Sequence, residues 1–270
     1  MKKLNQFITE KLKLSRNNKV QEYNYHPKTR NELDKLITEL IKERGNEANL
    51  NDIDVSNITD MSKLFKDTYF SGDISQWDVS NVKNMDFLFY RSYFNTDISA
   101  WDVSNVESMN SMFRTSVFDK DISQWDVSNV KNMSMMFHYS DFNQDISKWN
   151  VSNVEDMSLM FYISVFNQDI SSWDVSNVKD MENMFCESEF NQDISKWNVK
   201  NVETMASMFE KSRFNEDISN WDVSNVKNMN NMFKESKFNQ DISSWNVDKN
   251  TNTYNMFIYC PLEKNPPKWY

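Results

Sequence analysis

Residues 149–172 read WNVSNVEDMSLMFYISVFNQDISS, and residues 173–196 read WDVSNVKDMENMFCESEFNQDISK. The two segments share their aromatic, aliphatic and Asn/Asp/Ser positions. All nine tryptophans of the chain lie on one series with a step of 24 residues, from Trp77 to Trp269, and Ile53 occupies the same phase one step earlier. The chain therefore contains nine tandem copies of one unit, numbered here from position 1 at the tryptophan to position 24.

The apolar residues of the chain belong almost entirely to this unit. Its consensus is W-[DN]-V-S-N-V-x-x-M-x-x-M-F-x-x-S-x-F-N-x-D-I-S-x. Seventeen of the 19 phenylalanines fall at positions 13 and 18, and fifteen of the 17 methionines fall at positions 9 and 12. Because every copy repeats them in one phase, we expect these side chains to form a core that is continuous from copy to copy.

The second quarter of each copy has the periodicity of a short helix. In the copy that begins at Trp149, Val154, Met157, Met160 and Phe161 are spaced as i, i+3, i+6 and i+7, and the Ser-Asn pair at 152–153 offers an N-cap. This pattern predicts one helical stripe in each copy.

The beginning of each copy has the alternation of a short strand. Ile146 leads to Trp149 and Val151, the last two of which alternate with polar residues. One strand and one short helix cannot bury their own apolar faces, whereas stacked copies can. The sequence predicts a right-handed α/β solenoid of the leucine-rich-repeat type, with nine 24-residue strand–short helix repeats and an N-terminal helical cap.

The repeat W-[DN]-V-S-N-V-x-x-M-x-x-M-F resembles that of the BspA-like leucine-rich-repeat surface proteins, which is also abundant in mycoplasmal and other bacterial lipoproteins. The resemblance covers residues 53 to about 262. In the first full copy, Ile74, Trp77 and Val79 fit the three leucine positions of the familiar L-x-x-L-x-L-x-x-N pattern, and Asn81 comes one residue early. The resemblance implies an adhesion or interaction protein without enzymatic activity.

Both ends of the repeat array carry capping signals. The segment 29–32, Thr-Arg-Asn-Glu, reads as a capping box, apolar residues then follow with helical spacing, and Gly45 provides a helix stop. These features predict a helix over about 30–44 that covers the first copy. The expected organisation is an amphipathic tail and linker at 1–27, a helical N-cap at 28–52, the repeat solenoid at 53–262 and a C-terminal cap at 263–270.

The first residues allow two interpretations. Residues 1–14 form an amphipathic pattern without the apolar core of a signal peptide, and no lipobox cysteine follows, which favours a cytoplasmic or virion-associated location over export. The segment from Met1 to Glu10 also resembles the capsid-targeting peptides of T-even-like bacteriophages, which implies removal of residues 1–10 and a packaged virion protein. The other interpretation is a plain tail that precedes the cap helix.

Composition and charge exclude several classes of function. No apolar run reaches the ~18 residues of a membrane-spanning helix. Residues 1–52 have a net charge of +3 and residues 53–270 a net charge of −13, so nucleic acid is not an expected partner of the repeats. Two histidines and two cysteines offer no catalytic or metal-binding set, and only an acid pair such as Asp102 and Asp126 would suggest an enzyme. We expect no enzymatic activity, no cofactor and no metal.

Two periodic columns of charge are expected to be structural. The eight aspartates at position 21, from Asp73 to Asp241, should accept hydrogen bonds from main-chain amides in their turns, although stacked carboxylates also suggest a calcium site. Position 7 alternates between Lys and Glu from Lys83 to Lys227, which predicts ion pairs between neighbouring copies. Cys186 and Cys260 are three copies apart, too distant for a disulfide.

The variable positions 11, 14, 15 and 17 are the candidates for recognition, because interfaces draw affinity from large aromatic side chains. In the early and middle copies they include many aromatic and aliphatic residues, whereas in the later copies positions 14, 15 and 17 are mostly charged. The candidate binding residues are Tyr69, Phe87, Tyr90, Tyr93, His138, Tyr139, Tyr162 and Ile163, accompanied by Val117, Met135, Leu159 and Val165. Their partner would be a protein or a glycan, and the alternative is that these side chains pack inward locally.

Overall fold

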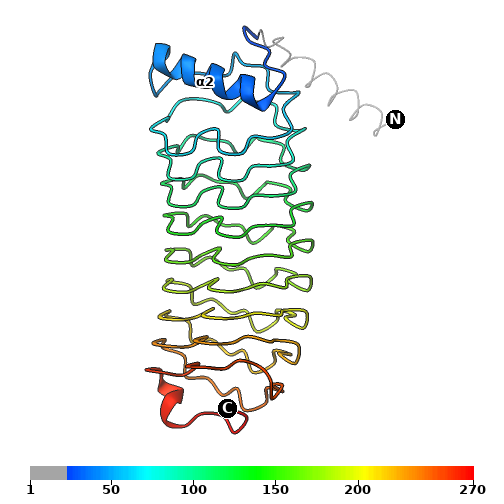
Figure 1. The fold of residues 1–270 in the computed structure, drawn as a ribbon, viewed down its shortest axis with the longest axis vertical. Coiled ribbons are helices and arrows are strands. Elements are labelled where there is room, and N and C mark those ends of the chain that lie inside the picture. Colours follow the sequence, from blue (N-terminus) through cyan, green and yellow to red (C-terminus); the bar gives the residue numbers. More distant parts are fainter. Residues whose placement is uncertain (1–22) are drawn as a thin grey trace, which may run out of the picture.

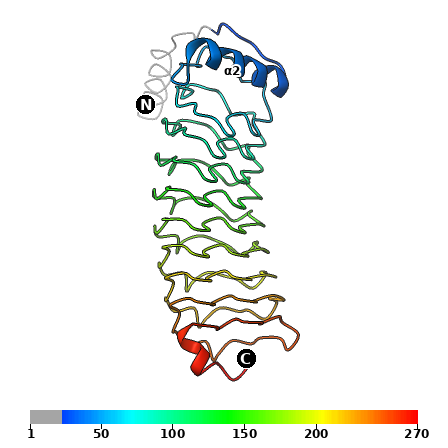
Figure 2. The same ribbon diagram turned by 60° about the vertical axis from the view of Figure 1, so that its left-hand side comes forward.

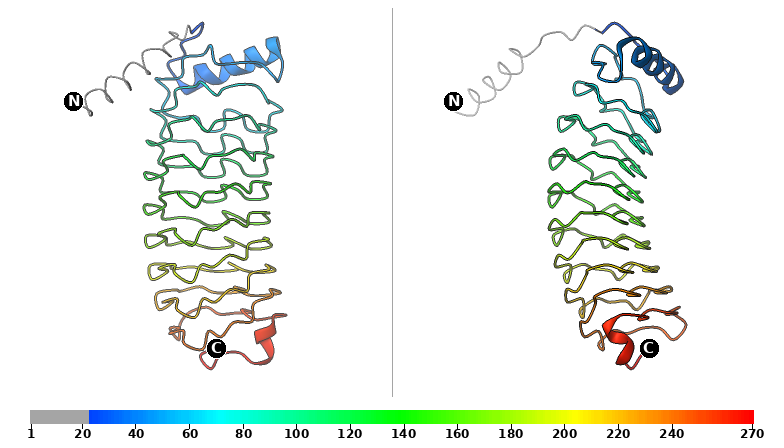
Figure 3. Two further views of the ribbon diagram at one scale, coloured as in Figure 1. Left: turned by 180° about the vertical axis from the view of Figure 1, so that it is seen from behind. Right: turned by 90° about the vertical axis from the view of Figure 1, so that its left-hand side faces the viewer.

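The computed structural model describes residues 23–270, which form one stack of coils that runs from the N-terminal to the C-terminal end of the described chain (Figure 1). Each coil is one 24-residue copy. Parallel β-bridges join equivalent residues of neighbouring copies, for example Asn132 to Asp156 and Asp156 to Asp180. Figure 2 shows the coils at a regular spacing, and Figure 3 shows that the stack curves gently.

Positions 9–16 of each copy form consecutive β-turns, so the short helix predicted for every copy is wrong. In the copy that begins at Trp149, the Met160 amide donates to the Met157 carbonyl and the Tyr162 amide donates to the Leu159 carbonyl, both at 3.2 Å. Leu159 and Ile163 have positive φ values of 54° and 49°. Positions 11 and 15 have positive φ in all nine copies, and none of these 18 residues is glycine.

The turns replace the helix because they direct main-chain groups toward the next coil. The Met133 amide donates to the Asp156 carbonyl at 3.0 Å, and the Met135 amide donates to the Ser158 carbonyl at 2.8 Å. An α-helix would use these amides within its own coil. The side chain of Asp156 also accepts from the Ser158 amide at 2.9 Å, which is an Asx turn that competes with helix formation.

The strand predicted at the start of each copy is replaced by turns as well. The Trp149 amide donates to the Ile146 carbonyl at 3.1 Å, and the Val154 amide donates to the Val151 carbonyl at 2.9 Å. These bonds within one coil occupy groups that a β-ladder would need. The described residues contain isolated bridges, mostly at position 8, instead of the predicted parallel strands.

At the start of each copy, positions 1–5, side chains make the hydrogen bonds between coils. The Trp149 indole Nε1–H donates to the carbonyl of Ile122 in the neighbouring coil at 3.0 Å. All nine tryptophans make the equivalent bond, at 2.9–3.2 Å. Asn153 at position 5 donates from Nδ2 to the Ser128 carbonyl at 2.7 Å, one rung of an asparagine ladder that runs from Asn81 to Asn225.

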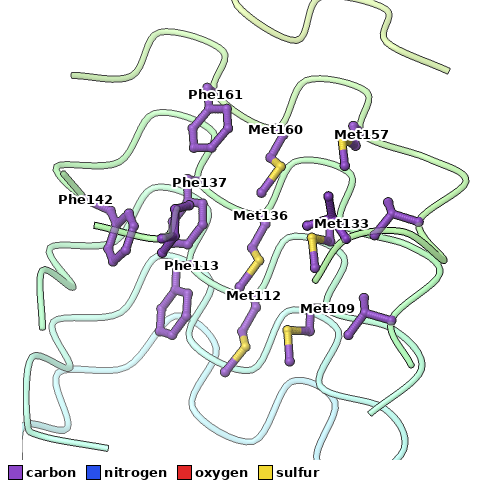
Figure 4. Packing of buried hydrophobic residues seen from close by; sticks show 14 of the residues in the cluster. Met109, Met112, Phe113, Met133, Met136, Phe137, Phe142, Met157, Met160 and Phe161 are labelled. Carbon is purple, nitrogen blue, oxygen red and sulfur yellow. The ribbon is translucent and has the colours of Figure 1, made fainter. Parts of the chain in front are cut away.

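The expected phenylalanine and methionine positions form the core. Phe113, Phe137 and Phe161 stack at ring-centroid distances of 5.8 Å, and Phe137 also lies 4.1 Å from Phe142 of its own coil. Figure 4 shows Phe113, Phe137 and Phe161 in one column, with Phe142 on one side of it and two columns of methionines on the other. The buried side chains form one continuous cluster from Leu33 to Cys260.

The N-terminal end of the stack is covered by helix α2, Arg30–Arg44 (Figure 1). The Thr29 side chain accepts from the Glu32 amide at 3.2 Å, and the Gly45 amide donates to the Ile41 carbonyl at 2.8 Å, as the capping signals predict. Leu33, Ile37 and Leu40 are buried in the core cluster. Nothing in the described part of the chain is a helix long and apolar enough to span a membrane.

The C-terminal end is covered by a 3-10 helix, η1, Pro261–Lys264, and by the last two residues. Trp269 stacks on Trp245 at a centroid distance of 6.0 Å, and Tyr270 lies edge-on against Phe257 at 4.8 Å. Cys186 and Cys260 are buried and unpaired, as their separation predicts. Residues 1–14 and the proposed cleavage after Glu10 lie outside the described residues.

Thr115→Gly should stabilise the chain, because Thr115 is a β-branched residue with a φ of 56°. Relief of the left-handed conformation is worth about 1–2 kcal/mol, and the added entropy of glycine costs about 0.5–1 kcal/mol. We expect the free energy of unfolding in urea to rise by about 0.5–1 kcal/mol. The control Val117→Gly, at a residue without positive φ, should lower it, and a loss of stability in both variants would contradict the assigned turns.

Candidate binding surface

The turn at positions 13–16 and the residue that follows it place two rows of side chains on the outside of the stack. Exposed large apolar side chains of the early and middle copies gather at positions 15 and 17. The exposed row consists of Tyr69, Tyr93, Val117, Tyr139 and Val165. Its three tyrosines are 68%, 58% and 57% exposed. In the described chain the other exposed large apolar residues are Tyr254, Tyr259 and Tyr270, all near the C-terminal end.

Two adjoining hollows follow this exposed row. The first has a volume of about 350 Å³ and is lined by Asp67, Thr68, Tyr69, Arg91, Ser92, Tyr93, Thr115 and Val117. The second has a volume of about 360 Å³ and is lined by Thr115, Ser116, Val117, Tyr139, Ser140, Asp141, Ile163 and Val165. Because the two hollows share Thr115 and Val117, they form one furrow along the stack.

A half-buried row lies beside the exposed row, at position 14. The Tyr90 ring has the Lys66 ammonium 5.2 Å and the Arg114 guanidinium 5.5 Å from its centroid, and Phe87 contacts it edge-on at 5.8 Å. Lys66 and Arg114 come from the copies before and after that of Tyr90, so the ring lies between two cations. These contacts are cation–π interactions.

His138 and Tyr162 continue the half-buried row. Their rings stack at a centroid distance of 4.8 Å. Burial, with a smaller contribution from the charge of Arg114, lowers the pKa of His138 to about 4, so the imidazole is neutral at pH 7. The buried Nε of Arg114 and Nδ1 of His138 have no hydrogen-bond partner among the described residues.

The same positions in the later copies are occupied by charges that pair with one another. Lys211 lies 3.3 Å from Glu187, Arg213 lies 2.8 Å from Glu189, and Lys234 lies 2.8 Å from Glu210, each pair joining neighbouring coils. The Glu210 carboxylate raises the pKa of Lys234. This half of the surface therefore neutralises its own charges.

The periodic carboxylates are held by the main chain and by neighbouring lysines. Each position-21 aspartate from Asp73 to Asp241 accepts from the amide of the serine two residues later, at 2.8–2.9 Å, which confirms their role in turns. These bonds lower the pKa of Asp97. The ion pairs predicted at position 7 form for Lys83–Glu107, Lys179–Glu155 and Lys227–Glu203.

Asp102 and Asp126 each accept from the serine amide two residues later, at 3.1 and 3.0 Å. Across the described residues, no group of three or more His, Cys, Asp or Glu side chains is arranged to hold a metal ion.

The model of the family described as "Mycoplasma protein of unknown function, DUF285" matches residues 34–139, 94–189 and 163–269. The chain belongs to this family. The three overlapping matches cover the cap helix and the whole repeat array, so the family model describes tandem repeats here. No curated protein and no solved structure matches the chain.

The structure divides the candidate residues into two groups. Tyr69, Tyr93, Tyr139 and Ile163 line the hollows, whereas Phe87, Tyr90, His138 and Tyr162 lie in the half-buried row or against it. The sequence reasoning did not single out the cations Lys63, Lys66, Arg91 and Arg114, which lie among these rings or border the first hollow. They occupy the same variable positions 11, 14 and 15 as the aromatic candidates, so the sequence signal that could have found them is the positive charge at those positions in the first three copies.

His138→Phe should remove part of the acid sensitivity of the fold. The pKa of His138 is lower in the folded chain than its ordinary value of 6.5, so the unfolded chain takes up a proton first as the pH falls. Wild type should therefore lose on the order of 2 kcal/mol of stability between about pH 6.5 and 4 through this group alone. Urea unfolding at several pH values should show a shallower pH dependence for the variant, and identical curves would contradict the assignment.

Proposed function

We propose that the chain is a non-enzymatic scaffold of the leucine-rich-repeat type, related to the BspA-like repeat proteins, that binds another protein or a glycan. The binding surface is the exposed row with its two hollows. The turns project the side chains of this row outward, while the side chains of the core come from other positions.

The observation that carries the proposal is where the exposed tyrosines lie. The repeat buries its tryptophans, phenylalanines and methionines almost completely, yet it leaves Tyr69, Tyr93 and Tyr139 more than half exposed on one side of neighbouring coils. Tyr69 and Tyr93 stack on each other at 5.1 Å. Contiguous exposed apolar side chains of this kind mark interaction surfaces, and tyrosine is enriched at their energetic centres.

The contrast between the two halves of the array supports recognition over a purely structural role. Position 17 is Tyr, Tyr, Val, Asp and Val in the first five copies, and Glu, Arg and Lys in the next three. The fold accepts both sets, because a position-17 side chain needs no partner in the core. A structural requirement therefore does not explain why the apolar residues gather in one half.

The triple variant Tyr69→Ala, Tyr93→Ala, Tyr139→Ala should lose its partner and keep its stability. Each surface substitution of this kind changes the free energy of unfolding by about 0.5 kcal/mol or less, so the three together should shift the melting temperature by no more than about 5 °C. The partner should come from pull-downs with cell-surface and lysate extracts and from a glycan array.

The matched control is Glu189→Ala, Arg213→Ala, Lys237→Ala, at position 17 of the later copies. It should capture the same partner as wild type. A second comparison, Tyr90→Ala with Tyr162→Ala, should lower stability by about 2 kcal/mol, because these rings are half-buried. Equal capture by wild type and the exposed-tyrosine variant, or capture by neither, would contradict the proposal.

A further inference from the structure

We infer that the partner presents a short acidic peptide segment, which the surface binds along its first five copies, with the cations in the first three. The cations concerned are Lys63, Lys66, Arg91 and Arg114, called here the basic end. The inference rests on the proposed function and narrows it, because it states the chemistry that the exposed row and its hollows recognise. The acidic part of the segment meets the basic end, and its apolar part occupies the second hollow.

Three of the four cations of the basic end lie over aromatic rings, and the group as a whole pairs with few carboxylates. Lys63 lies 5.6 Å from the centroid of Phe87, and Lys66 and Arg114 lie over Tyr90. Asp67 is the one acid that pairs with this group in the described chain, 3.8 Å from Lys66 and 3.4 Å from Arg91. A cation that lies on a ring face is covered on one side only. Its other side can still bind a carboxylate.

Arg114 is the clearest case of a cation that the fold does not neutralise. Its contacts are the Tyr90 ring and, at 3.2 Å from one terminal nitrogen, the sulfur of Met135. Its Nε is buried without a partner in the described residues, and it forms no ion pair with any of them. A half-buried guanidinium without an anion costs free energy, which an added carboxylate would recover.

In the later copies, cations at the same positions form ion pairs with carboxylates of the fold. Lys211, Arg213 and Lys234 occupy positions 15, 17 and 14, and each lies within 3.3 Å of a carboxylate of the neighbouring coil. In the early copies Tyr90 and His138 occupy position 14 on either side of Arg114, where the later copies place Glu210 beside Lys234, and Asp67 is the one acid at position 15. The unpaired cations are therefore a property of the early copies and not of the repeat.

The charge of the remaining surface limits the ligand to a short segment. Residues 53–270 carry 19 Lys/Arg against 32 Asp/Glu, so a long polyanion that crossed the basic end would meet repelling carboxylates on either side. The hollows extend over five copies, or about 19 Å at ~4.8 Å per coil, which an extended peptide of about six residues covers. The second hollow, with Val117, Tyr139, Ile163 and Val165, suits apolar side chains.

The test is selection of a random dodecapeptide library on the full-length protein at low ionic strength. The enriched sequences should carry Asp or Glu in one half and apolar residues in the other. The best of them, labelled with fluorescein, should bind at least tenfold more weakly to the double variant Lys66→Ala, Arg114→Ala, and binding should weaken as salt increases. Lys63→Glu, at an exposed residue that leaves Tyr90 and its cations in place, should weaken binding as well.

The control variant Lys211→Ala, Arg213→Ala, at the paired positions of the later copies, should change the affinity by less than about twofold. Enriched peptides that lack acidic residues but still require Tyr69, Tyr93 and Tyr139 would overturn the acidic ligand and leave the proposed function standing. No enrichment at all would overturn the peptide ligand, whereas the proposed function would fall only if the pull-downs and the glycan array also gave no partner. Stronger displacement of the labelled peptide by heparin or an oligonucleotide than by hexaglutamate would overturn the assignment to a peptide.

Discussion

The structure depends on main-chain hydrogen bonds that cross from one coil to the next within the turn region. Positions 9, 11, 13 and 15 donate to the carbonyls of positions 8, 10, 12 and 14 of the following coil, as the Met157, Leu159, Phe161 and Ile163 amides do at 2.8–3.0 Å. Positive φ at positions 11 and 15 makes this possible, because the chain can turn and still point alternate amides along the stack. The unfavourable left-handed conformation of residues such as Leu159 is offset by the bond that its own amide makes.

This arrangement separates the scaffold from the surface. The bonds between coils use main-chain groups, tryptophan indoles and short polar side chains, while phenylalanine and methionine fill the interior. Side chains at positions 15 and 17 take no part in the core, and their contacts between coils differ from copy to copy, as the Tyr69–Tyr93 stack and the Lys211–Glu187 ion pair show. The array can therefore carry tyrosines in one half and paired charges in the other without a change of fold, which is what a recognition scaffold built from repeats requires.

Much of the fold could be predicted from the sequence, but not the secondary structure within the repeat. Spacing alone fixed the copy length, the buried columns, the capping helix and the turn role of the position-21 aspartates. The helix predicted at Val154, Met157, Met160 and Phe161 was wrong because consecutive turns also bring those positions inward. The contrary signal was the Asn, Asp and Ser content of positions 8 and 10, since such side chains bond to the main chain two residues later and disfavour helix.

The candidate surface was predicted only in part, for a similar reason. Variation between copies pointed to the right positions, but a one-dimensional pattern does not tell an exposed tyrosine, such as Tyr69, from a half-buried one, such as Tyr90. Nor does it show that Arg114 lies over a ring while Arg213 meets a carboxylate. Those differences depend on which residues of neighbouring coils lie above and below, and so on the geometry of the stack.

The most direct test of this account is native-state hydrogen exchange of the central copies. If the bonds between coils carry the fold, the amides of Met133, Met135, Phe137 and Tyr139 should be protected as strongly as the best-protected amides of the chain, although they lie in turns and not in a helix or strand. Exchange of these amides at the rate of an open surface loop would contradict the account.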